Sequence, residues 1–179
     1  MNDADPAAAD KRATGPAARP IGAGVRIGHV HLKVADLERA LGFYGGVLGF
    51  DLTQRYGSHV AFLSAGGYHH HIALNTLESH DGPPPAPGTT GLYHVAILYP
   101  TRAELADALR RVLAAGIRLD GATDHGISEA LYLRDPDDNG VELCWDRPAA
   151  EWPRTASGEL AMYNAWLDVE DLLREPAPA

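Results

Sequence analysis

The stretch TDHGISEALYLRDPDDNGVELCWD, residues 123–146, decides the fold. It predicts two short strands, ALYLR at 130–134 and VELCW at 141–145, joined by the polar turn DPDDNG, because Pro, Asp, Asn and Gly favour chain reversal. Burying ionisable groups in such a hairpin is costly unless a metal ion or a substrate satisfies them. The hairpin is therefore predicted to form one wall of an active site, with a carboxylate, a phenol and an imidazole at Glu142, Tyr132 and His125.

The composition limits the kinds of partner that the protein is expected to bind. Fifteen Lys and Arg stand against 24 Asp and Glu, a net charge of −9, so neither nucleic acid nor an anionic membrane is expected as a partner. The sequence contains no apolar run of the roughly 20 residues needed to span a bilayer. The first 24 residues lack the apolar segment of a signal peptide, and we expect a disordered arm on a cytoplasmic protein. The single cysteine, Cys144, is expected to be an apolar filler of a strand.

The first half of the chain predicts one structural unit. Residues 25–34 alternate like a strand that carries His29 and His31 on one face. A helix follows, capped by Asp36 and ended by Gly49. Three further strands are predicted at 50–55, 59–64 and 68–75.

The same order of elements restarts after a Pro- and Gly-rich segment. A strand at 91–100 precedes a helix that begins with a Thr101–Glu104 capping box and ends at Gly116. A short strand at 117–119 and the hairpin complete the unit. His29 and His94 lie 94 − 29 = 65 residues apart, at matching places, so the chain is read as a tandem repeat.

We therefore predict an α+β fold, in which two tandem βαβββ modules form a half-open mixed β-sheet barrel around a metal ion. For the last 30 residues, a short helix packed over the sheet or a partner and a partly ordered tail stay open as alternatives. The predicted bounds are a disordered arm at 1–24, a first module at 25–78, a linker at 79–90, a second module at 91–148 and a C-terminal extension at 149–179.

Aligning the two units gives equivalent places to His29 and His94 on the first strands, and to His71 and Glu142 on the last strands. If the modules pack about a pseudo-twofold axis, these side chains meet in the cleft between them. Imidazole with carboxylate is a ligand set suited to iron, manganese, nickel or zinc. A lone histidine in a strand is more often structural, but the matched places favour a metal site.

Two motifs then carry a family resemblance. GHVHLKVADLERALGFYGGVLGF at 28–50 and DPDDNGVELCW at 135–145 resemble the module start and module end of the vicinal oxygen chelate superfamily, which includes glyoxalase I, fosfomycin-resistance proteins and extradiol ring-cleaving dioxygenases. The run from Thr123 through Glu142 is most similar to the signature of type I extradiol catechol 2,3-dioxygenases. Asp138 stands where that signature usually has glycine, so the turn is expected to adopt another conformation.

The resemblance implies a metal triad of His29, His94 and Glu142 that binds Fe(II), with Mn(II) as the alternative. It implies a catechol and O2 as substrates, a ring-opened semialdehyde as product, and a place in aromatic catabolism. The implied catalytic residues are His70, as the acid and base, together with Tyr132 and His125, which face the substrate. Whether His71 or His31 joins the metal shell is left open, although His70 is favoured over His71 as the functional histidine of its triplet.

Two other functions remain as alternatives. The first is another metal-dependent member of the superfamily, a glyoxalase, an epimerase or a fosfomycin-type thiol transferase, with His71 as a fourth ligand. The second is a metal-free drug binder of the bleomycin-resistance kind. Many extradiol enzymes of this superfamily have four modules, whereas this chain has two. Its pocket is therefore expected to be completed by its own tail or by a second subunit, which makes a homo-oligomer the expected state.

Overall fold

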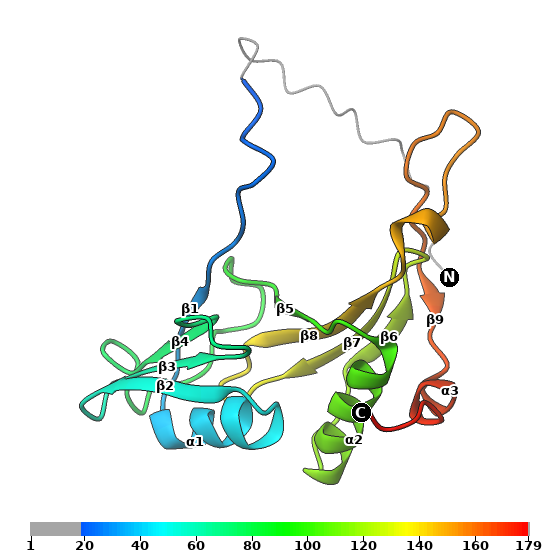
Figure 1. The fold of residues 1–179 in the computed structure, drawn as a ribbon. Coiled ribbons are helices and arrows are strands. Elements are labelled where there is room, and N and C mark those ends of the chain that lie inside the picture. Colours follow the sequence, from blue (N-terminus) through cyan, green and yellow to red (C-terminus); the bar gives the residue numbers. More distant parts are fainter. Residues whose placement is uncertain (1–18, 179) are drawn as a thin grey trace.

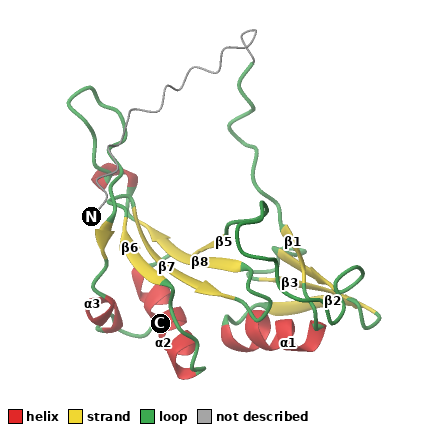
Figure 2. Cartoon of the chain, turned by 180° about the vertical axis from the view of Figure 1, so that it is seen from behind, coloured by secondary structure: helices red, strands yellow, loops and turns green. Residues whose placement is uncertain are grey.

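The chain folds into two mixed sheets that lie side by side, with helices under one face and the other face open (Figures 1 and 2). This computed structural model describes residues 19–178, so most of the predicted disordered arm lies outside the described residues. The predicted α+β class of two βαβββ modules is confirmed, and within residues 19–178 the sheets do not close into a barrel.

The first module builds a four-stranded sheet in the order β1-β4-β3-β2, in which β1 and β4 run parallel. Asp36 caps its helix as predicted, because the carboxylate accepts a hydrogen bond from the Arg39 backbone N–H at 3.0 Å. The elements are β1 (Val30–Lys33), α1 (Leu37–Leu41), the π-helix η1 (Gly42–Val47), β2 (Asp51–Tyr56), β3 (Val60–Ser64) and β4 (Ile72–Asn75).

The second module builds a five-stranded sheet in the order β5-β8-β7-β6-β9, in which β5 and β8 run parallel. The Thr101 hydroxyl accepts from the Glu104 backbone N–H at 3.2 Å, which confirms the predicted start of the helix. The elements are β5 (Val95–Leu98), α2 (Arg102–Ala114), β6 (Gly121–Asp124), β7 (Ser128–Arg134) and β8 (Gly140–Asp146).

Several predicted strands are shorter than expected. The strand predicted at 25–34 begins only at Val30, and the one predicted at 68–75 begins only at Ile72, so His29 and the histidine triplet lie in the segments that enter the strands. The strand predicted at 117–119 is wrong. The Ile117 backbone N–H donates to the Val112 carbonyl at 3.1 Å, in the turn that follows the helix, and residues 117–119 form no strand.

The strand registers correct the alignment of the two modules. Val30 pairs with Ile72 in the first sheet, and Val95 pairs with Val141 in the second. Because Val30 and Val95 are equivalent, Glu142 corresponds to Ala73 and not to His71. The repeat therefore gives no reason to expect His71 as a metal ligand.

A buried hydrogen bond joins the two modules. Tyr44 of η1 has no exposed surface, and its hydroxyl donates to the Asp135 carboxylate at 2.9 Å. The same carboxylate accepts the backbone N–H groups of Asp137 and Asn139, both at 2.9 Å. Burial, followed by the charge of Asp135, raises the pKa of Tyr44, so this phenol remains a donor.

In the turn before β8, Asp138 stands where the extradiol signature usually has glycine. Asp138 itself adopts the left-handed conformation, with φ of 65°. Asp is one of the few residues besides Gly that visit this region readily. Asp138 thus takes a conformation that glycine adopts readily, and the expected difference from the glycine-bearing turn stays a prediction.

The C-terminal extension folds onto the second module, as one of the two alternatives predicted. Its strand β9 (Ala165–Trp166) pairs with β6, and its helix α3 (Val169–Leu173) packs against α2, with Leu172 fully buried (Figure 1). A short 3-10 helix, η2 (Ala149–Glu151), precedes them. Among the described residues, no helix has both the length and the apolar character that a membrane span requires.

Replacing Tyr44 by Phe is expected to lower the free energy of unfolding by about 2 kcal/mol, because a buried carboxylate loses one donor. Urea denaturation measures this change. Tyr56→Phe is the matched control, since that side chain is 59% exposed on β2, and it should change stability by less than about 0.5 kcal/mol. Equal losses of unfolding free energy in the two variants would contradict the proposed contribution of the Tyr44–Asp135 hydrogen bond to stability.

Candidate active site

A cavity of about 500 Å³ opens on the second module, a volume typical of small-molecule sites. Two of the predicted catalytic residues and one predicted metal ligand line it. The lining includes His94, Gly121, His125, Tyr132, Gly140 and Asn164.

Two of the three predicted metal ligands lie side by side. His94 directly precedes β5 and Glu142 lies on β8, and the parallel pairing of these strands brings His94 Nε2 to 2.8 Å from Glu142 Oε2. Both side chains are largely buried, with 31% and 12% exposed. Ligand atoms that bind one divalent ion at 2.0–2.2 Å lie about 3 Å apart when their bonds are perpendicular. The spacing and the donor chemistry of this pair therefore fit a shared metal ion.

Gly140 allows the strands to approach closely enough for this contact. A Cβ atom at this position would lie 2.0 Å from the Tyr93 carbonyl oxygen and 3.1 Å from the His94 Cα. Any side chain here would push the His94 segment away from β8. The glycine at the end of DPDDNG is thus required by the packing of the site.

His125 and Tyr132 form a second pair beside the first. His125 Nε2 lies 2.8 Å from the Tyr132 hydroxyl, and the ring of Tyr132 lies 5.7 Å from that of His94. Burial, followed by the charge of Glu142, raises the pKa of Tyr132 to about 12. The phenol therefore stays protonated at neutral pH.

The first module carries the remaining predicted residues. The rings of His29 and His70 lie 4.4 Å apart, and His70 also packs against Phe62 at 4.8 Å. The Nδ1 atoms of His70 and His69 lie 2.8 Å apart. Desolvation, followed by the neighbouring imidazoles of His29 and His69, lowers the pKa of His70. His29 and His70 are thus brought together, in the other sheet from His94.

His71 and His31 are engaged in other contacts. His71 Nδ1 accepts from the Ala65 backbone N–H at 3.3 Å and lies 3.1 Å from the Ser64 hydroxyl. His31 Nε2 lies 3.0 Å from the Asn75 side-chain nitrogen. These bonds give both imidazoles a local structural role.

The complete triad is not assembled by the described residues of one chain. Nowhere in residues 19–178 do three His, Cys, Asp or Glu side chains gather closely enough to hold a metal ion. The pair His94–Glu142 fits such an ion, whereas His29 lies with His70 in the other sheet. The triad as a whole stays a prediction.

Sequence reasoning missed the residues that the extension contributes. Asn164 lines the cavity, and the Tyr163 carbonyl oxygen lies 3.3 Å from His125 Nδ1. Both lie outside the repeat, so no matching position in the first module could point to them. The extension is thus part of the cavity wall.

Comparison with known proteins agrees with the motifs. The sequence pattern described as "Glyoxalase/Bleomycin resistance protein/Dioxygenase superfamily" matches residues 26–143. The chain is similar to a catechol-2,3-dioxygenase of Bacillus subtilis (strain 168), with 42% identity over 151 residues that cover 83% of this chain and 51% of that protein. It is also similar to biphenyl-2,3-diol 1,2-dioxygenase 3 of Rhodococcus globerulus, with 33% identity over 118 residues, 66% of this chain and 62% of that one. The chain thus spans less than two thirds of either relative.

Solved structures show the same fold. A glyoxalase/dioxygenase from Nostoc punctiforme superposes with a TM-score of 0.58 at 20% identity, over 74% of this chain and 100% of that one. Lactoylglutathione lyase from Agrobacterium tumefaciens superposes with a TM-score of 0.54 at 23% identity, over 69% of this chain and 96% of that one. At these identities the likeness is one of fold.

Gly140→Ala is expected to weaken binding of Mn(II) by about 10-fold, because it separates two ligands that the backbone holds in place. Calorimetric titration of the metal-free protein measures the affinity. Gly46→Ala is the matched control, since a Cβ there meets nothing within 4 Å, and it should bind Mn(II) like the wild type. Wild-type affinity in Gly140→Ala would show that the close approach does not set the ligand spacing.

Proposed function

Because the chain belongs to the Glyoxalase/Bleomycin resistance protein/Dioxygenase superfamily, we propose that it is a metal-dependent extradiol dioxygenase that cleaves a catechol-type ring with O2. One observation carries the proposal. His94, His125 and Tyr132 line one cavity, and Glu142 contacts His94 directly behind that lining, so candidate ligands for a metal ion adjoin donors and acceptors for substrate hydroxyl groups. The similarity to catechol and biphenyl-diol dioxygenases supports this reaction class.

In this proposal His29, His94 and Glu142 hold the metal ion, Fe(II) with Mn(II) as the alternative. Two histidines and one carboxylate are the ligand set of non-haem Fe(II) oxygenases, and an ion held by these three residues would supply the redox chemistry that O2 activation requires. The protein supplies a dry, shaped wall around that ion. Glu142 is 12% exposed, so few waters compete for its oxygens.

Tyr132 and His125 orient the diol. A phenol whose pKa is raised to about 12 keeps its single hydrogen, which would turn from His125 Nε2 to a substrate oxygen when a diol binds and so stabilise negative charge there. His125, bonded to that phenol, offers a second polar atom at the same wall. Together they select a ring with adjacent oxygens over a plain apolar ring.

His70 moves the proton in this proposal. Its ring lies 4.4 Å from that of His29 between centroids and packs at a tilt against the apolar ring of Phe62 at 4.8 Å. An imidazole can accept a hydroxyl proton and return it near neutral pH, which is the task that ring cleavage requires of an acid and base.

We further propose that two copies of the chain share each site. His29 and His70 lie on one sheet of the chain, and His94 and Glu142 on the other. All six residues of β2 are exposed, as is 82% of Tyr93 beside the cavity, which suits a surface that a second copy covers. A twofold dimer would then bring the first module of one copy onto the second module of the other.

The direct test is an assay of purified protein loaded with Fe(II) without air, then mixed with catechol and O2. Equimolar O2 uptake and a yellow ring-opened product are expected. Lack of O2 uptake with catechol, alkylated catechols and biphenyl-2,3-diol would reject the proposed reaction.

His70→Phe should keep the metal ion and lose most turnover, since the proton carrier is gone while the ligands remain. Metal content by mass spectrometry and kcat by O2 uptake separate the two effects. His59→Phe is the control, because that histidine is bonded to Thr76, away from the cavity lining. Full turnover in His70→Phe would remove His70 from the mechanism.

Mixing two inactive variants tests the shared site. His29→Ala and Glu142→Ala should each lose the metal ion. If sites form between copies, mixed dimers regain one intact site each, and an equal mixture that exchanges subunits should recover about a quarter of wild-type activity. A site formed within each chain predicts no recovery at all.

A further inference from the structure

The C-terminal extension makes a polar contact with His125 that fixes which ring nitrogen carries the proton. The Tyr163 carbonyl oxygen lies 3.3 Å from Nδ1, and a carbonyl can only accept, so Nδ1 carries the hydrogen. In a neutral ring Nε2 is then the acceptor, and the Tyr132 hydroxyl at 2.8 Å donates to it. The contacts thus assign the Nδ1–H tautomer.

The backbone holds Tyr163 in this place. Its N–H donates to the His125 carbonyl at 3.2 Å, and Ala165 of β9 pairs with Asp124 of β6. Gly126 is buried beneath the segment, where a Cβ atom would lie 2.5 Å from Tyr163 Cε1 and 2.9 Å from Pro153 Cγ. The extension is therefore seated directly on the loop that carries His125.

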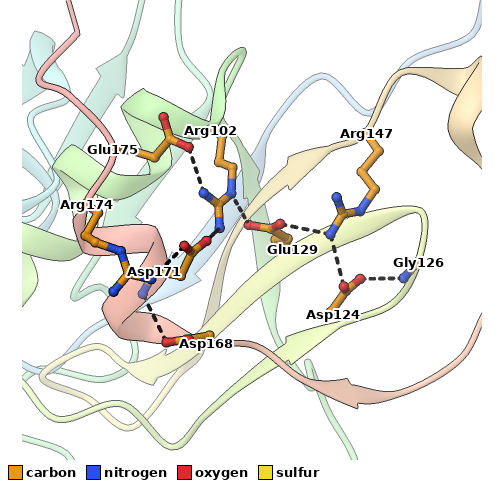
Figure 3. Close-up of polar contacts among 9 residues, drawn as sticks. All are labelled: Arg102, Asp124, Gly126, Glu129, Arg147, Asp168, Asp171, Arg174 and Glu175. Atoms are coloured by element: carbon orange, nitrogen blue, oxygen red, sulfur yellow. Dashed lines mark hydrogen bonds and ion pairs between the residues drawn. The ribbon is translucent and has the colours of Figure 1, made fainter.

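Charged side chains also hold the loop that carries His125 in place. The Asp124 carboxylate accepts from the Gly126 backbone N–H at 2.7 Å and from Arg147 Nη2 at 3.0 Å (Figure 3). The same arginine nitrogen donates to Glu129 at 2.8 Å. Glu129 is 3% exposed, so its charge must be matched by its partners.

The other oxygen of Glu129 ties the far end of the extension to the same point. It accepts from Arg102 Nε at 2.7 Å, and the two remaining nitrogens of Arg102 donate to Asp171 and Glu175 at 2.8 and 2.7 Å (Figure 3). The carboxylate thus links α3 to the loop of His125 through two arginines. Movement of the extension would leave two nitrogens of the largely buried Arg102 without their carboxylate partners.

We propose that the extension is a positioning element of the active site. The Tyr163 main-chain carbonyl holds His125 as the Nδ1–H tautomer, and Arg147, through Asp124, holds the loop that carries it. Nε2 is thereby kept free of a proton and directed at Tyr132, ready to accept a hydrogen bond from a hydroxyl group. The role in catalysis rests on the proposed function, whereas the tautomer does not.

The test measures the tautomer of His125 in the metal-free protein by long-range proton–nitrogen NMR with labelled histidine. The His125 signals are assigned by their loss in His125→Gln. The spectra are recorded at about pH 8.5, well above the ordinary imidazole pKa of about 6.5, and the wild type is expected to carry the hydrogen on Nδ1. Gly126→Ala, which displaces Tyr163, and Arg147→Gln, which releases Asp124, should both shift the ring towards the Nε2–H form.

Two further variants separate positioning from general stability. Arg147→Lys keeps the positive charge and should restore most of the wild-type tautomer. Arg174→Gln is the matched control, because this arginine is 66% exposed and pairs with Asp171 on the outer side of the cluster. Its spectrum should be that of the wild type.

A wild-type ring found as the Nε2–H form would overturn the proposal, whether or not any variant folds. An unchanged tautomer in both folded variants, Gly126→Ala and Arg147→Gln, would also overturn it. In the Fe(II)-loaded enzyme, the same two variants should lower kcat about 10-fold with catechol. A wild type inactive on catechols would reject the proposed function and leave the NMR result standing.

Discussion

Parallel pairing between the first and last strand of each module is the constraint on which the site depends. It places a residue at the entrance of one strand beside a residue more than 40 positions later in the chain, as for His94 and Glu142. In the first module the same pairing brings His29 to the His70 ring. A parallel pair needs a long connection, which the helix and the antiparallel strands of each module provide. The repeated topology thus creates two half-sites from one pattern.

Much of this arrangement was predictable from local signals. The caps at Asp36 and Thr101, the turn before β8 and the alternating strands all act over a few residues, and the structure confirms them. The register between paired strands could not be predicted from these local signals. Aligning His71 with Glu142 placed two metal-binding residue types at equivalent positions. The structure shifts this alignment by two residues, which keeps the same face of the strand, so the alternation of side chains alone cannot reveal the error.

The contribution of the extension could not be predicted for a different reason. Its contacts with the site run through the main chain of Tyr163 and through Asn164, and neither bears a motif. A main-chain carbonyl is present at every residue, so only the three-dimensional path of the chain shows which one meets His125. Likewise, the residues around Glu129 do not indicate that its carboxylate is buried between two arginines, because Arg102 lies 27 residues before it and Arg147 18 residues after it.

The outer strand of the first sheet has a consequence for handling the protein at high concentration. Among residues 19–178, β2 lies at the edge of its sheet, so one row of its N–H and C=O groups has no neighbouring strand there. Such an edge can recruit strands from other molecules and start fibrous aggregates. Here the register skips Thr53, and the charged side chains of Asp51 and Arg55 flank the bulge. An interrupted, charged edge is a poor template, which keeps a fully exposed strand from polymerising.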